Sequence, residues 1–170
     1  PNAGRAVAQR AAKVLKKTVL ELGSNDAYLI LADADLKKAV QYCVQGRVYN
    51  TGQTCVAAKR YIVEDAIYDQ FRDACFCPAT VLENVAPGQP AYDEELFGPV
   101  ASLIRVKDAE EAMKVANDSP YGLGGGIFSQ NEARAIEMAR EEFDTGMVNI
   151  NGYNLAQPNL PFGGVKESGY

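Results

Sequence analysis

Short apolar runs alternate along this chain with longer segments in which apolar residues recur every three or four positions. The first pattern is typical of strands and the second of amphipathic helices. We expect helices over residues 5–17, 35–49 (with Asp33 or Asp35 as the cap), 65–75 (with Asp65 as the cap) and 132–142, and a further helix that Asp108 caps and that contains residues 109–116. We expect strands over residues 18–22, 28–31, 60–63, 80–85, 100–106, 123–128 and 146–150, and loops over 87–99 and 151–170.

Strands and helices therefore alternate through almost the whole chain, which favours the α/β class with a largely parallel sheet flanked by helices. The apolar runs lack polar alternation, as strands do when helices cover both faces of their sheet. In sheets of this kind the loops at the carboxyl ends of the strands usually carry the chemistry. We expect the functional residues of this chain at that edge.

Composition narrows the class of protein further. The chain has 170 residues, enough for one domain, with 47% hydrophobic and 23% charged residues, as in packed globular proteins. Its net charge of −5 and the absence of a basic block argue against nucleic acid and anionic membrane surfaces as partners. The sequence contains no apolar run long enough to span a membrane and no signal-peptide core.

The absence of histidine excludes Ser-His and Cys-His catalytic pairs and His-ligated zinc within this sequence. The cysteines are four, Cys43, Cys55, Cys75 and Cys77, fewer than a secreted disulfide scaffold of this length would carry. The Cys75–Cys77 pair has no second pair to complete a zinc site, so we expect no metal. Reduced cysteines and a cytoplasmic location are the simplest interpretation.

Cys55 is the first candidate for chemistry, because it follows a polar, glycine-containing loop over residues 50–54. A cysteine at the start of a turn or helix meets free backbone N–H groups, which would lower the pKa of its thiol and could bind an oxyanion. The alternative is a small buried apolar residue. That alternative is stronger for Cys43, which lies on the apolar face of a predicted helix.

Two acidic positions are further candidates. Glu21 ends the apolar run 18–22 and is either a partly desolvated general base or an edge-strand carboxylate that faces water. Glu94 and Glu95 precede Phe97 and a Gly-Pro turn, which could hold a polyhydroxylated ligand or be a solvated acidic turn. The glycines of residues 122–126 do not form a dinucleotide fingerprint and precede a strand, so we expect close packing there.

Several of these segments, taken together and in order, resemble the aldehyde dehydrogenase superfamily. The resemblance rests on five motifs over nearly the whole chain, and the segments 149–153 and 161–170 are most similar to the succinate-semialdehyde dehydrogenase branch. The motifs are Glu21-Leu-Gly-Ser-Asn-Asp26, Asn50-Thr-Gly-Gln-Thr-Cys55, Glu94-Glu-Leu-Phe-Gly-Pro-Val100, Asn117-Asp-Ser-Pro-Tyr-Gly-Leu123 and Pro161-Phe-Gly-Gly-Val-Lys-Glu-Ser-Gly169.

The resemblance implies an oxidation of an aldehyde, most specifically succinate semialdehyde, to a carboxylic acid with NAD or NADP. It implies that Cys55 is the nucleophile, passing through a thiohemiacetal and a thioester, and that Glu21 activates the hydrolytic water. It assigns cofactor binding to Glu95 at the nicotinamide ribose, to Phe97 beside the nicotinamide and to the backbone of Leu22. A homo-oligomer is implied for the intact enzyme.

The resemblance also implies a domain organisation. Residues 1–20 correspond to a remnant of the cofactor-binding domain, 21–150 to the catalytic domain and 151–170 to a C-terminal loop segment, with an internal family segment missing near 75–77. The family's second motif glycine is Ser24 here. We therefore expect this chain alone to be inactive. The alternative is a non-catalytic truncated paralogue that acts as a structural or association module.

Arg47 is a candidate partner for the distal carboxylate of a dicarboxylic semialdehyde substrate.

Overall fold

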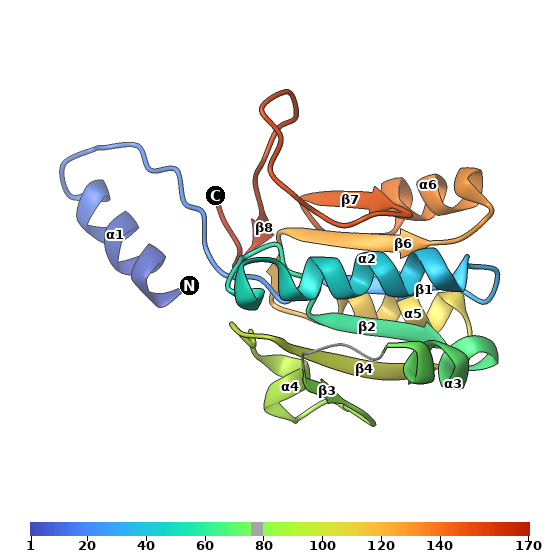
Figure 1. Cartoon of the computed structure of the whole chain (residues 1–170). Coiled ribbons are helices and arrows are strands. Elements are labelled where there is room, and N and C mark those ends of the chain that lie inside the picture. The colour runs from blue at the N-terminus through green and yellow to red at the C-terminus, as the bar shows by residue number, and fades with distance from the viewer. Residues whose placement is uncertain (76–79) are drawn as a thin grey trace.

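The centre of the molecule is a fully parallel sheet, in a computed structural model that describes residues 1–75 and 80–170 (Figure 1). Within these residues the sheet has six strands in the order β3-β4-β2-β1-β6-β7. The strands are β1 Ala27–Ile30, β2 Arg60–Glu64, β3 Thr80–Leu82, β4 Val100–Val106, β6 Gly124–Phe128 and β7 Met147–Ile150. The expected parallel α/β architecture is confirmed.

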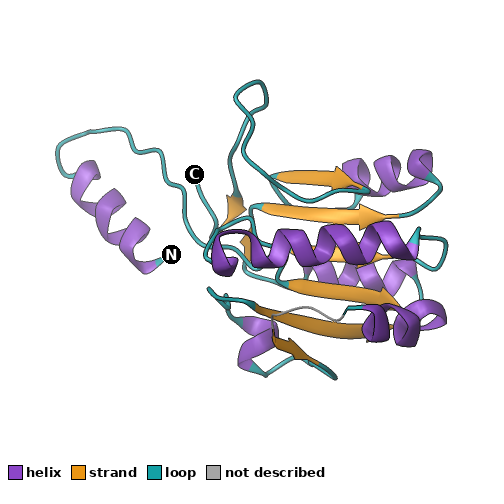
Figure 2. Cartoon of the chain, in the orientation of Figure 1, coloured by secondary structure: helices purple, strands orange, loops and turns teal. Residues whose placement is uncertain are grey.

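Helices cover both faces of this sheet (Figure 2). One apolar core joins the sheet to α2 (Leu36–Val48) and α3 (Asp65–Ala74), and the other joins it to α5 (Ala109–Asn117) and α6 (Glu132–Glu141). The shorter or peripheral helices are α1 (Asn2–Ala12), η1 (Tyr49–Gly52) and α4 (Pro90–Asp93).

Strand β1 shows why its sequence carries no polar alternation. All four of its residues are buried, and successive side chains point to opposite faces of a strand. Leu29 packs in the core beneath α5 and α6, whereas Tyr28 and Ile30 pack in the core beneath α2 and α3. Each face therefore needs apolar side chains, as the uninterrupted run predicted.

Capping side chains set the starts of three helices. Asp35 accepts from the N–H of Lys38 at 3.0 Å, and Asp108 accepts from the N–H of Glu111 at 2.9 Å. Asn131 does the same for α6. These caps satisfy backbone donors that the first helical turn leaves without intrahelical partners. The expected cap at Asp65 is wrong by one position, since Asp65 is the first residue of α3 and Glu64 precedes it without a capping bond.

The strand expected over residues 18–22 is wrong. This segment leads from α1 to the sheet, and its Val19 side chain is 89% exposed. Its last residues pair with the other end of the chain over a short stretch: Glu21 forms an antiparallel bridge with Gly169, and backbone hydrogen bonds join residues 20–22 to residues 168–170. This pairing is too short to form a strand over 18–22, because β-branched, apolar composition produces a strand only where a neighbouring strand pairs along its length.

The expected loops also contain short elements. Residues 151–170 include β8 (Val165–Lys166), which pairs antiparallel with β5 (Tyr121–Gly122), and residues 87–99 include the single turn of α4. Helix α1 lies apart from the sheet at the left of Figure 1. No helix in the described part of the chain is long and apolar enough to cross a membrane. The junction expected near 75–77 lies, beyond Cys75, outside the described residues.

Candidate functional site

Most of the polar residues singled out by the motifs meet at the amino-terminal edge of the sheet. Ser24 lies just before β1, Cys55 before β2 and Glu95 before β4, and parallel strands place all their amino ends at one edge. The expectation of a site at the carboxyl ends is therefore wrong for these residues. The order of each motif and its following strand in the sequence was the signal that could have shown this.

A strained loop presents Cys55. After α2 ends, Asn50 and Thr51 adopt φ angles of 50° and 58°, and Gly52 adopts 73°. Left-handed backbone is costly for residues with a Cβ, and most of all for a β-branched threonine. Asn50 Nδ2 donates to the carbonyl of Gln53 at 3.0 Å and helps to hold this shape.

The Cys55 thiol is partly exposed, and burial raises its pKa. The positive charge of Lys59 and the backbone N–H groups of Val56 and Cys55 act in the opposite direction. The expected N–H groups are therefore present and act to lower the thiol pKa, but desolvation is the largest effect and the net shift of the pKa is upward. Cys43 is fully buried on α2, as its place on the apolar face predicted.

Arg47 holds the loop of residues 49–54 that precedes Cys55. Its buried guanidinium donates to the carbonyl of Gly52 at 2.6 Å and to that of Val100 at 3.3 Å. Burial lowers the pKa of Arg47. A cation committed to two backbone carbonyls is not presented to a substrate, so the expectation of a substrate contact is contradicted. Arg47 instead ties the loop before Cys55 to the start of β4.

Lys59 joins the segment around Cys55 to the acidic motif at Glu95. Its side chain is 1% exposed, and Nζ donates to the carbonyl of Cys55 at 2.6 Å. The same Nζ lies 3.2 Å from Oε1 of Glu95, and that oxygen also accepts from the N–H of Ser24 at 3.1 Å. Burial lowers the pKa of Lys59, while Asp26 and Glu95 oppose this. Sequence reasoning missed this residue, although a lysine directly before a buried strand was a visible signal.

Asp26 completes the buried polar set behind the site. It accepts from the hydroxyl of Ser24 and, at 3.0 Å, from the N–H of Gly124. Burial raises the pKa of the Asp26 carboxyl, and the charge of Lys59 opposes the rise. A Cβ at Gly124 would collide with this carboxylate. The close packing expected for residues 122–126 is confirmed.

Three other predicted site residues lie differently. Glu21 is exposed, which favours the water-facing alternative, and no hydrogen bond or ion pair joins it to Cys55 in the described part of the chain. Leu22 packs toward Gly4 of α1, where an added Cβ would lie 2.7 Å from Leu22 Cδ1. The Phe97 side chain is 55% exposed. The structure thus brings together Cys55 and Glu95 through Lys59.

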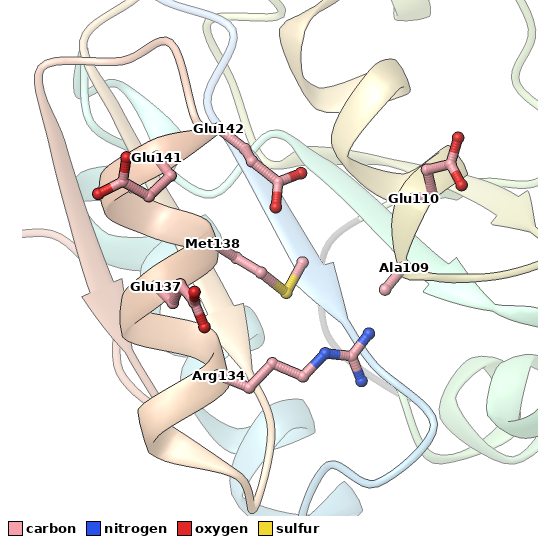
Figure 3. A pocket seen from close by; sticks show the side chains of 7 residues that line it. All are labelled: Ala109, Glu110, Arg134, Glu137, Met138, Glu141 and Glu142. Carbon is pink, nitrogen blue, oxygen red and sulfur yellow. The ribbon is translucent and has the colours of Figure 1, made fainter.

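A separate pocket of about 330 Å³ lies between α5 and α6 (Figure 3). Its lining is mostly acidic, with Arg134 and Met138 between the carboxylates of the two helices. It contains none of the residues that the motifs singled out. Among the described residues, no cluster of Cys, Asp and Glu side chains could hold a metal ion. This pocket is therefore distinct from the polar cluster around Cys55.

Comparison with known proteins gives one consistent family. The sequence model of the aldehyde dehydrogenase family matches residues 1–76 and 71–170 of this chain. A succinate-semialdehyde dehydrogenase [NADP(+)] of Deinococcus radiodurans is 39% identical over 99% of this chain and 47% of its own length. Succinate semialdehyde dehydrogenase [NAD(P)+] Sad of Escherichia coli is 37% identical over 99% of this chain and 49% of its own.

Solved structures agree. The crystal structure of succinic semialdehyde dehydrogenase from Streptococcus pyogenes in complex with NADP+ superposes with a TM-score of 0.93 at 34% identity. The superposition covers 99% of this chain and 50% of that one. This chain thus spans about half the length of the relatives that it matches.

Proposed function

This chain belongs to the aldehyde dehydrogenase family, and from that premise we propose that it is the catalytic portion of an enzyme that oxidises an aldehyde to a carboxylic acid. The observation that carries the proposal is the partly exposed Cys55, held at the sheet edge beside the Lys59–Glu95 ion pair. Because the chain spans about half of its relatives, the activity is proposed for the whole protein.

The proposed reaction starts at Cys55. Its thiolate adds to the aldehyde carbon, and the backbone N–H groups of Val56 and Cys55, which act to lower the pKa of the thiol, would stabilise the resulting oxyanion. Glu95, Phe97 and the backbone of Leu22 would hold NAD or NADP, which would supply a hydride acceptor. The thiohemiacetal carbon would give up its hydride and remain on Cys55 as a thioester. Water activated by Glu21 then cleaves the C–S bond, which releases the carboxylic acid and returns the thiol.

Glu95 and Phe97 fit a role in cofactor binding. The Glu95 carboxylate retains 19% exposure and uses one oxygen for Lys59 and Ser24, so its remaining lone pairs can accept from ribose hydroxyls. A Cβ at Gly23 would collide with this carboxylate, so the backbone must approach it closely. The exposed ring of Phe97 is available for a nicotinamide face. The backbone of Leu22, which directly precedes Gly23, would complete the contacts with the cofactor.

We propose succinate semialdehyde as the substrate, with NAD or NADP as acceptor. Support comes from the names of the relatives at 39% and 37% identity, one NADP(+)-dependent and the other NAD(P)+-dependent. Arg47 is occupied by backbone carbonyls, so a cation that recognises the distal carboxylate must come from elsewhere. We also propose a cytoplasmic homo-oligomer for the intact enzyme.

The domain organisation proposed from the sequence has indirect support. The two matches to the family model meet at residues 71–76, and the alignments run over 225 or 226 positions although the chain has 170 residues. Both facts agree with a missing internal segment near 75–77. We keep residues 1–20 as a cofactor-domain remnant, 21–150 as the catalytic domain and 151–170 as a C-terminal segment.

The test uses the full-length enzyme with succinate semialdehyde and either cofactor. Cys55→Ala should abolish oxidation and ester hydrolysis, and Glu21→Gln should allow the first hydride transfer but block hydrolysis of the thioester. Cys43→Ala, at a buried cysteine on α2, is the matched control and should retain turnover. Turnover that persists in Cys55→Ala would remove Cys55 from the nucleophile role, whereas a parent enzyme without any turnover would favour the non-catalytic alternative.

A further inference from the structure

We propose that Lys59 is a positioning residue for the nucleophile, whose buried ammonium group fixes the main chain of Cys55 against the carboxylate of Glu95. The inference rests on the proposed roles of Cys55 and Glu95. It goes beyond these roles because it assigns a function to a side chain that is neither the nucleophile nor a cofactor-binding group. Lys59 would set both where the thiol lies and which charge it meets.

The geometry around Nζ supports this role. Its three donors are directed to the carbonyl of Cys55 at 2.6 Å, the carbonyl of Thr54 at 3.3 Å and Oε1 of Glu95 at 3.2 Å. Two of the three acceptors are thus consecutive carbonyls at the nucleophile itself. The turn that carries the thiol therefore cannot shift without breaking a bond to a buried charge.

The electrostatic setting separates this lysine from an ordinary surface ion pair. Lys59 is nearly inaccessible to solvent, and a buried ammonium group is costly unless oppositely charged and polar groups surround it. The charged groups that face it are Asp26 before β1, Glu95 after α4 and Arg47 on α2. Two cations and two carboxylates balance, and the Cys55 thiol lies beside this set. Removing the charge of Lys59 leaves two buried or partly buried carboxylates near the thiol.

The experiment measures the rate of alkylation of Cys55 against pH on the chain, with each cysteine resolved by mass spectrometry of its peptide. Lys59→Met keeps much of the side-chain volume and removes the charge. We expect it to raise the apparent pKa of Cys55 by about one unit, so that alkylation near neutral pH slows about tenfold. Lys59→Arg should restore most of the profile, because the charge returns.

Glu95→Gln tests the same pair from the other side. It leaves the charge of Lys59 less compensated, so we expect the apparent pKa of Cys55 to fall. Lys37→Met, at an exposed lysine on α2, is the matched control and should leave the profile unchanged. Alkylation of the buried Cys43 reports loosening of the fold, because loosening would accelerate the alkylation of Cys43 and Cys55 together.

A Lys59→Met profile that superposes on the parent profile would overturn the inference. If Lys59→Met does not fold, Lys59→Arg and Glu95→Gln decide. An apparent pKa of Cys55 that rises or stays unchanged in Glu95→Gln also overturns the inference. Failure of the proposed function has a different signature, since Cys55 would then react as slowly as Cys43 in the parent chain.

Discussion

A matched pair of glycines provides a sharp test of how the loop before Cys55 is held. Gly52 and Gly88 both have positive φ angles, 73° and 85°. A Cβ at Gly88 would meet nothing within 4 Å, whereas a Cβ at Gly52 would lie 2.6 Å from the carbonyl carbon of Gly98 and 2.8 Å from Nη2 of Arg47. Substitution by alanine therefore separates backbone strain from close contact.

The expected magnitudes follow from these contacts. Alanine in the left-handed region costs about 1 kcal/mol, and this cost is common to both positions. At Gly52 the loop must also move away from the Gly98 backbone, which disrupts the 2.6 Å bond from Arg47 to the Gly52 carbonyl. A hydrogen bond to a charged group contributes about 1.5–3 kcal/mol. We expect losses of about 1 kcal/mol for Gly88→Ala and about 2.5–4 kcal/mol for Gly52→Ala.

Urea unfolding at neutral pH measures both free energies of unfolding, and alkylation of Cys55 gives an independent local measurement. Only Gly52→Ala should change the alkylation rate, because Gly52 lies in the loop before Cys55 and Gly88 does not. Equal losses for the two variants, within about 0.5 kcal/mol, would refute the tight packing of Gly52 against Gly98 and Arg47.

Three further predictions concern stability and activity. Arg60 is buried and donates to three backbone carbonyls. Arg60→Met should therefore lower the free energy of unfolding, measured in urea, by about 3–5 kcal/mol. The control Arg72→Met, at a more exposed arginine, should lower it by less than about 0.5 kcal/mol. Burial and then Asp118 raise the pKa of Tyr92 to about 12, so the stability from its neutral phenol is present below about pH 10 and is lost as the pH rises toward 12. Difference titration against Tyr92→Phe checks this, and Asp118→Asn should lower the phenol pKa; a Tyr92 that titrates near 10 would contradict it. The 170-residue chain alone should not reduce NAD or NADP with succinate semialdehyde, as measured by cofactor absorbance; turnover would show that the chain is sufficient.

Local patterns predicted much of the fold because both faces of the sheet are covered. Strand β4 spans the predicted residues 100–106, and Asp108 caps α5 as its position indicated. Such features depend on burial periodicity and on hydrogen bonds between near neighbours. The strand predicted over 18–22 did not form because its pairing with residues 168–170 is short, and no local pattern specifies how far a partner extends.

The motifs by themselves determined the candidate nucleophile Cys55, the acidic residues Glu21 and Glu95, and the resemblance to a family that the comparisons then confirmed. Only the tertiary structure decided which side chains surround Cys55. Lys59 contacts the carbonyl of Cys55 from four residues away, but the other partner of Lys59, Glu95, is distant in sequence. Arg47 joins the loop before Cys55 to β4. Burial and long-range pairing fix the charge around a thiol, and both arise only when the parallel strands bring their amino ends to one edge.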